Sequence, residues 1–164
     1  MDDFIALLDQ NHIVTGINVS SKKALFELVA THISNLHPGL ADEELVCTLM
    51  QRERLGSTCI GEGIAVPHCR LADNKKSIVG LFTLASPIIY NDDDEMVDII
   101  AVLLVPENAT DIHLHLLSQI ASSMQTKAVR TALRQSNTSE QVMVALQRAA
   151  TPYQEDAANQ ASSY

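Results

Sequence analysis

The residue with the clearest capacity for chemistry is His68, which ends the run Val66-Pro67-His68 after a glycine-rich stretch. Proline fixes its own φ near −65° and drives the preceding residue toward extended geometry. We therefore expect a short strand over residues 64–67 to stop here and to present His68 from its end. An imidazole with an unperturbed pKa of about 6.5 is a usable nucleophile at neutral pH. A histidine that only hydrogen-bonds a loop is the alternative interpretation.

A second histidine, His113, is predicted to face the core from the first turn of a helix over residues 111–124. At about 100° per residue it lies near the centre of an apolar arc, whereas His115 lies on the opposite, polar arc. The arc consists of Ile112, Leu116, Leu117, Ile120 and Met124. Burying an unpartnered imidazole costs about 1 kcal/mol or more, and the first turn of a helix favours an anion. A phosphoryl group would both give the imidazole a polar partner and supply the anion. A backbone carbonyl in the core would give only the partner.

Two arginines, Arg52 and Arg54, flank the apolar stripe of another predicted helix, which begins near residues 41–43 and ends near residue 54. That stripe consists of Leu45, Val46, Leu49 and Met50. Periodicity does not choose between the two arginines, and an arginine is usually a solvated charge.

The elements that must position these residues follow from hydrophobic period and from capping signals. They are a strand at 12–17, a helix from Ser20 or Ser21 to about 36, strands at 77–85 and 97–105, and helices at 111–124, to about 134, and at 140–150. Thr138 and Gln141 have the spacing of a capping box, and the acidic run 92–95 reads as an exposed connection. Buried strands among helices indicate an α/β fold with a mixed sheet sandwiched by helices.

Length and composition favour one domain. A chain of 164 residues can bury about 70% of the surface that it exposes when unfolded. We assign residues 1–150 to this domain and residues 151–164, which lack an apolar period, to a flexible C-terminal tail.

Charge and apolar content limit the partners. The formal charge of −9 repels phosphate backbones and anionic lipids, so we expect neither nucleic acid nor a membrane surface as a partner. The longest apolar run, Ile99 to Val105, is far below the roughly 20 residues that span a bilayer. An acidic beginning without a cleavage signal and an odd number of cysteines predict a cytoplasmic protein.

A metal site is one alternative function, because Cys59, His68, Cys69, His113 and His115 are all possible ligands. The spacing is poor, since two of them are adjacent and a His-x-His pair on a helix points its rings apart. We expect no metal and no organic cofactor. A second alternative is a pure binding module without catalysis of its own.

The residues 52–58, RERLGST, and 61–68, GEGIAVPH, resemble the active-site signature of the mannitol/fructose-type enzyme IIA (EIIA) domains of the bacterial phosphotransferase system, and most closely the nitrogen-regulatory branch. The resemblance implies the mannitol-type EIIA fold and a phosphoryl group carried on His68. It also implies that His113 matches a second histidine beside the first. Of the two arginines, the resemblance selects Arg52, which precedes the glutamate.

The resemblance further implies a phosphotransferase component, a histidine phosphoryl carrier charged by an HPr/NPr-like phosphocarrier protein. In the nitrogen-regulatory branch such a carrier docks on transporters or sensor kinases according to its phosphorylation state. The alternative is a stand-alone EIIA of a fructose/mannitol-type sugar uptake system that passes the group to an EIIB. A free-standing chain favours the regulator. Glu62 stands where the nitrogen branch often has asparagine, and this departure favours the sugar relay. Cys59 and Cys69 occupy positions at which glycine is common in the family.

Overall fold

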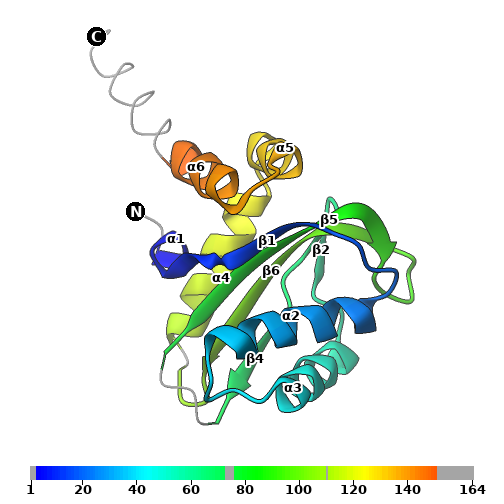
Figure 1. Ribbon diagram of the computed structural model, residues 1–164, viewed down its shortest axis with the longest axis vertical. Coiled ribbons are helices and arrows are strands. Elements are labelled where there is room, and N and C mark those ends of the chain that lie inside the picture. Colours follow the sequence, from blue (N-terminus) through cyan, green and yellow to red (C-terminus); the bar gives the residue numbers. More distant parts are fainter. Residues whose placement is uncertain (1–2, 73–75, 110, 151–164) are drawn as a thin grey trace, which may run out of the picture.

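One mixed sheet with helices on both faces forms the body of the chain in a computed structural model, which describes residues 3–72, 76–109 and 111–150 (Figure 1). The elements are α1 (Asp3–Leu7), β1 (Leu8–Ile17), α2 (Lys22–Leu36), α3 (Asp42–Leu55), β2 (Cys59–Gly61), β3 (Ile64–Ala65), β4 (His68–Leu71), β5 (Ile78–Ile89), β6 (Met96–Pro106), α4 (Asp111–Met124), α5 (Lys127–Gln135) and α6 (Ser139–Ala150). The predicted tail, residues 151–164, lies outside the described residues. The predicted α/β class, with a mixed sheet between helices, is confirmed.

The sheet is organised around the antiparallel pair β5 and β6, in which Phe82 is opposite Ile100. The strand order is β1-β5-β6-β3-β2, and β4 also pairs with β6. β1 runs parallel to β5 at one edge, and both β3 and β4 run parallel to β6. Two segments of chain that are separated by a proline therefore share the same neighbouring strand.

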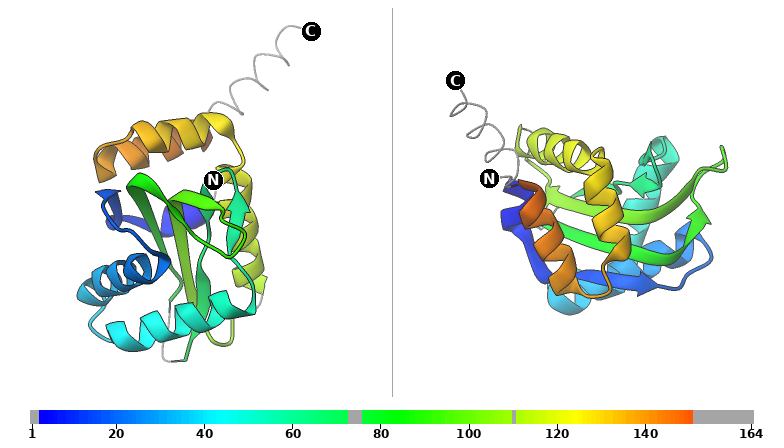
Figure 2. Two further views of the ribbon diagram at one scale, coloured as in Figure 1. Left: turned by 90° about the vertical axis from the view of Figure 1, so that its right-hand side faces the viewer. Right: turned by 90° about the horizontal axis from the view of Figure 1, so that it is seen from above.

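The two faces of the sheet are covered by different helices (Figure 2). Side chains alternate along a strand, so Phe82 and Ile100 pack in the cluster with α2 and α3, whereas Leu81 and Ala101 pack with α1, α4, α5 and α6. Strand β6 is consequently buried on both faces over residues 99–105, as its continuous apolar sequence predicted. Among the described residues, no helix has both the length and the apolar content needed to cross a membrane.

Local signals explain most of the boundaries. The Ser21 side chain accepts a hydrogen bond from the Ala24 amide at 3.1 Å and starts α2. At α6, Thr138 Oγ1 accepts from the Gln141 amide at 3.2 Å, while Gln141 Oε1 accepts from the Asn137 amide at 2.6 Å. The predicted capping pattern is confirmed, with one difference. The Gln141 side chain accepts from the amide of Asn137, one residue before Thr138, instead of from the amide of Thr138 itself.

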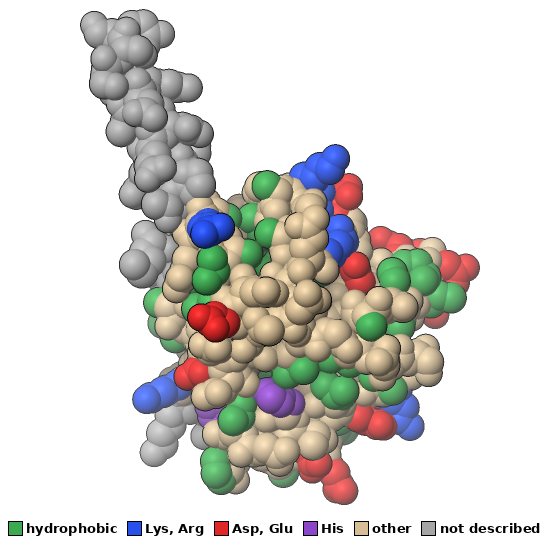
Figure 3. Space-filling view, turned by 45° about the horizontal axis from the view of Figure 1, so that its top comes forward, with side chains coloured by type: hydrophobic (Ala, Val, Ile, Leu, Met, Phe, Trp, Pro, Cys, Tyr) green, Lys and Arg blue, Asp and Glu red, His purple; other side chains and the backbone are tan. Residues whose placement is uncertain are grey.

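Some boundaries differ from the prediction. Helix α1 was not predicted, β1 begins earlier than residue 12, and β5 continues past Pro87 instead of ending at residue 85. The proline is tolerated because the β5–β6 register shifts between Thr83 and Ile88, and a bulge leaves its missing N–H without a cost. The acidic run 92–95 is exposed in the connection between β5 and β6, as expected, and acidic side chains gather at that edge in Figure 3.

The turn between β2 and β3 is held by α5. Gly61, Glu62 and Gly63 all have positive φ, of 90°, 57° and 80°. Arg134 Nη2 donates to the Glu62 carbonyl at 2.6 Å, and the same guanidinium makes two bonds to the Asp98 carboxylate, at 2.8 and 3.0 Å. A β-carbon at Gly63 would lie 2.5 Å from Arg134 Nη2 and 2.7 Å from Asp98 Oδ1. The turn that leads toward His68 therefore requires glycine at position 63.

We predict that Gly63→Ala lowers the free energy of unfolding by about 2 kcal/mol, because it combines strained backbone with displacement of an ion pair. Gly39→Ala is the control, since open space surrounds Gly39 and its φ is not positive. That variant should change stability by no more than about 1 kcal/mol. Urea unfolding at pH 7.5 measures both. Equal midpoints for the two variants would contradict the prediction.

Candidate functional site: a histidine pocket at the β4–α4 junction

His68 is the first residue of β4, where it pairs with Leu103 of β6. The expected strand over residues 64–67 does stop before the proline, with β3 ending at Ala65. His68 does not project from that end, however, because a second strand, β4, begins at His68. Proline removes one backbone donor but keeps its acceptor, and the Pro67 carbonyl accepts a hydrogen bond from the Leu103 amide at 3.0 Å. The chain therefore continues along β6 after the proline, and His68 is fixed by strand pairing on its own backbone.

The ring of His68 is oriented by the backbone just before it. His68 Nδ1 lies 2.8 Å from the Val66 carbonyl oxygen. A carbonyl only accepts hydrogen bonds, so Nδ1 must carry the proton in this contact. In the neutral ring the other nitrogen, Nε2, is then left with a free lone pair.

His113 lies next to His68, as the resemblance implied. It occupies the first turn of α4, is only 8% exposed, and its ring centroid is 5.3 Å from that of His68. The prediction that it faces inward is confirmed, and its buried Nδ1 has no hydrogen-bond partner among the described residues. Ile112, predicted to face inward, is 60% exposed. Only the centre of the apolar arc contacts the sheet at this end of the helix, and Ile112 lies on its margin.

Arg52 lies with the two histidines in a pocket of about 420 Å³ that also includes Thr48, Gln51, Leu55, Cys69 and Arg70. It is half-buried near the end of α3, and its Nη1 donates to the Gly56 carbonyl at 2.9 Å. This bond occupies one of the five guanidinium N–H groups. Arg54 is exposed and does not line the pocket, so the structure separates two arginines that periodicity could not.

The environment lowers the pKa of both histidines. Burial has the largest effect and lowers the pKa of His68. The hydrogen bond to the Val66 carbonyl raises this pKa in part, the charge of Arg52 lowers it again, and the charge of Glu53 raises it least. Burial also lowers the pKa of His113, followed by the charges of His68, Arg70 and Arg52. Both rings are therefore neutral at pH 7.

Arg70 was missed by the sequence analysis. It is exposed, lines the same pocket and comes two residues after His68 on β4. Side chains two residues apart in a strand share a face. The signal was present in the sequence but was hidden by the expectation that the strand ends at His68.

Of the residues considered as metal ligands, His68, Cys69 and His113 line one pocket, whereas Cys59 and His115 do not. Cys59 Sγ faces the Glu95 carboxylate at 3.4 Å, and His115 contacts Gln119. Burial raises the pKa of Cys69 to about 12, so that thiol stays protonated at neutral pH. Within residues 3–72, 76–109 and 111–150, no group of three or more His, Cys, Asp or Glu side chains is arranged to hold a metal ion.

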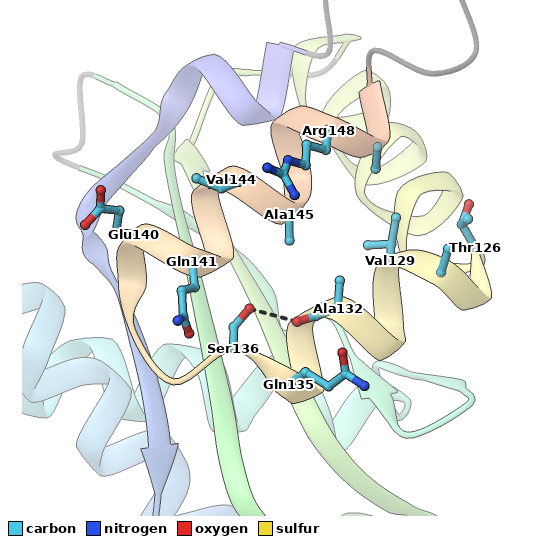
Figure 4. A pocket seen from close by; sticks show the side chains of 12 residues that line it. Thr126, Val129, Ala132, Gln135, Ser136, Glu140, Gln141, Val144, Ala145 and Arg148 are labelled. Carbon is cyan, nitrogen blue, oxygen red and sulfur yellow. Dashed lines mark hydrogen bonds between the residues drawn. The ribbon is translucent and has the colours of Figure 1, made fainter. Parts of the chain in front are cut away.

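A larger cavity, of about 720 Å³, lies between α5 and α6 (Figure 4). Small apolar side chains such as Val129, Ala132 and Ala145 line much of it, with Glu140 and Arg148 from α6. Ser136 Oγ is already bonded to the Ala132 carbonyl at 2.7 Å. The lining contains neither histidine nor cysteine, so the His68 pocket is the better candidate for group transfer.

The fold is that of the mannitol-type EIIA proteins, in which a mixed sheet lies between helices. The mannitol IIA protein of Escherichia coli superposes with a TM-score of 0.70 over 84% of this chain and 97% of that chain, at 19% identity. The nitrogen regulatory protein IIA-Ntr of Neisseria meningitidis gives a TM-score of 0.79 at 34% identity, over 87% of this chain and 98% of that chain.

The chain belongs to the family described as phosphoenolpyruvate-dependent sugar phosphotransferase system, EIIA 2, which it matches over residues 6–149. It is similar to a nitrogen regulatory protein of Pseudomonas aeruginosa, with 37% identity over 82% of this chain and 88% of that protein. A nitrogen regulatory protein of Escherichia coli is 33% identical over 77% of this chain and 78% of that protein. The resemblance to the nitrogen-regulatory branch is confirmed.

We predict that His68 and His113 titrate below pH 6.5 in the folded protein, and that His68→Ala raises the pKa of His113 by removing a neighbouring positive charge. Because both folded-state pKa values are lowered, the unfolded chain binds protons first. The stability that depends on these two neutral rings is therefore fully present above about pH 6.5 and decreases as the pH falls below that value. NMR titration of the imidazole signals tests this. Midpoints at or above 6.5 would contradict it.

Proposed function

We propose that this protein is a histidine phosphoryl carrier of a phosphotransferase system, charged at His68 Nε2 by an HPr/NPr-like phosphocarrier protein. The observation that carries the proposal is the 2.8 Å contact between His68 Nδ1 and the Val66 carbonyl. It holds the proton on Nδ1 and leaves Nε2 as the nucleophile, without any partner base.

The transfer balances without a cofactor. A bond forms between His68 Nε2 and phosphorus as the bond from phosphorus to the donor's imidazole nitrogen breaks, and that bonding pair returns to the donor. The transition state is loose, so the protein mainly positions the group and neutralises its charge. The proton stays on His68 Nδ1, hydrogen-bonded to the Val66 carbonyl, throughout.

Arg52 and His113 would stabilise the transferring group. The remaining guanidinium donors of Arg52 can contact two phosphoryl oxygens at once, and the imidazole of His113, which lines the same pocket, can donate to a third through a protonated ring nitrogen. Both residues line the pocket with His68. Fixed donors of this kind act without reorganising during the reaction.

A regulatory output is the favoured biological setting, in the cytoplasm. The relatives named nitrogen regulatory proteins support it. Large apolar side chains also surround the pocket: Leu55 lines it and is 86% exposed, and Ile112 and Leu114 flank His113 on the surface. Exposed apolar groups around a site suit protein contact. A phosphoryl group added among them would change which transporter or sensor kinase binds there.

The sugar relay is the second candidate. A mannitol IIA protein of Escherichia coli, 18% identical to this chain, has been solved in complex with phosphorylated IIB of the mannitol system. A mannosylglycerate-specific EIIABC component is 25% identical over 149 residues. By this alternative, His68 would pass its phosphoryl group to an EIIB protein.

We predict that the chain takes up label from a ³²P-phosphorylated general phosphocarrier and that His68→Ala takes up none. Undiminished labelling of the variant would overturn the assignment of His68. The labelled wild type then separates the two candidates: a regulator retains its label when mixed with an EIIB of the fructose/mannitol type, whereas a sugar relay loses it.

Arg52→Lys should lower the rate of labelling by about tenfold or more, because lysine keeps the charge but not the two-pronged geometry. Arg54→Lys is the matched control two residues away, and its rate should stay within about twofold of wild type, since Arg54 lies outside the pocket. Stopped-flow or quenched labelling at pH 7.5 gives both rates. Equal losses in the two variants would count against a specific contact by Arg52.

A further inference from the structure

A buried carboxylate, that of Glu53, lies behind the pocket without lining it. Glu53 is 6% exposed and follows Arg52 on α3. Its Oε1 accepts hydrogen bonds from the Thr58 amide at 3.0 Å and from Tyr90 Oη at 2.8 Å, and it also accepts from the Thr58 hydroxyl. Its Oε2 lies 3.5 Å from Lys22 Nζ.

This carboxylate joins parts of the chain that are far apart in sequence. Lys22 begins α2, Tyr90 follows β5, and Thr58 belongs to the loop between α3 and β2. A buried charge is costly unless it is hydrogen-bonded and paired. Two of the three hydrogen bonds that Glu53 Oε1 accepts come from Thr58, so the position of the loop at Thr58 is tied to the carboxylate. Glu53 Oε2 has no hydrogen-bond partner among the described residues.

A short series of hydrogen bonds leads from this loop to the nucleophile. The Thr58 carbonyl accepts from the Val66 amide at 2.9 Å. The Val66 carbonyl in turn accepts from His68 Nδ1 at 2.8 Å. Two residues, each bonded at both its N–H and its C=O, therefore separate Glu53 from the ring of His68.

We propose that Glu53 is a positioning residue for phosphoryl acceptance, which holds Thr58 and Val66 so that the Val66 carbonyl keeps His68 in the tautomer with a free Nε2. The inference rests on the proposed function for its effect on rate, but the effect on the tautomer is independent of it. Glu53 acts through other residues and does not touch the reacting atoms.

A purely electrostatic role is the competing explanation. Glu53 carries a negative charge near the site, and that charge raises the pKa of His68 slightly against the larger effect of burial. The two explanations differ in which property of the Glu53 side chain a substitution must retain. Positioning requires an oxygen that reaches the Thr58 amide, whereas an electrostatic role requires the charge.

Two substitutions separate these requirements. Glu53→Gln keeps the length and a carbonyl oxygen for the Thr58 amide but removes the charge, and Lys22, whose side chain is 25% exposed, can turn toward solvent. Glu53→Asp keeps the charge but withdraws the carboxylate by one methylene. ¹⁵N NMR of the unphosphorylated protein at pH 7.5 reports the His68 tautomer, and labelling by the phosphocarrier reports the rate.

We expect Glu53→Asp to mix the two tautomers and to slow labelling by about tenfold, and Glu53→Gln to keep the Nδ1–H tautomer and to lie within about threefold of wild type. A wild-type tautomer and rate in Glu53→Asp, or a greater loss in Glu53→Gln than in Glu53→Asp, would overturn the proposal. If Glu53→Asp shows no cooperative thermal unfolding, Glu53→Gln decides alone, and a tenfold loss in it refutes positioning. If wild type takes up no label, the proposed function fails, and the tautomer comparison still decides the role of Glu53.

Discussion

The pairing of one buried strand, β6, with the chain on both sides of Pro67 is the constraint on which the site depends. β3 places Ile64 beside Ile99, β4 places His68 beside Leu103, and the Pro67 carbonyl bridges the gap. β6 is buried on both faces, so its register is set by the core. A slip of one residue would turn every side chain of β4 to the opposite face. The direction of His68 is therefore fixed by packing far from the pocket.

The pocket also needs both helical layers. Arg52 comes from α3, which packs on one face of the sheet, and His113 comes from α4, which packs on the other. Strand β6 packs against both helical layers, and β4 pairs with β6. Arg52 and His113 therefore reach His68, the first residue of β4, from opposite faces of the sheet. Neither layer could form the site alone. The Arg134 contacts to Glu62 and Asp98 extend the same dependence to α5, since they hold the turn that precedes β3.

Most helices, the central strands and the inward direction of His113 could be predicted because they follow from hydrophobic period and capping. The second strand that begins at His68 could not be predicted, since the sequence shows only that proline lacks a donor and not that its carbonyl has a partner on β6. Arg70 was missed as a pocket residue for the same reason. The buried state of Glu53 was equally hidden, because its partners Tyr90 and Lys22 are distant in sequence and a glutamate beside two arginines resembles a solvated charge.

The electrostatics of the pocket suit a group that is held briefly. The chain carries a formal charge of −9, yet the pocket presents Arg52 and Arg70 beside two histidines whose pKa values are lowered by burial. In the proposed function, neutral imidazoles would keep the His68 nucleophile available at pH 7, and the cations would offset the charge of the incoming phosphoryl group. Because Arg52 already donates to Gly56 and Arg70 is exposed, neither guanidinium can enclose the phosphoryl group fully. If the protein carries the phosphoryl group as proposed, this partial neutralisation would favour release, since equal stabilisation of the bound state and the transition state would not speed transfer.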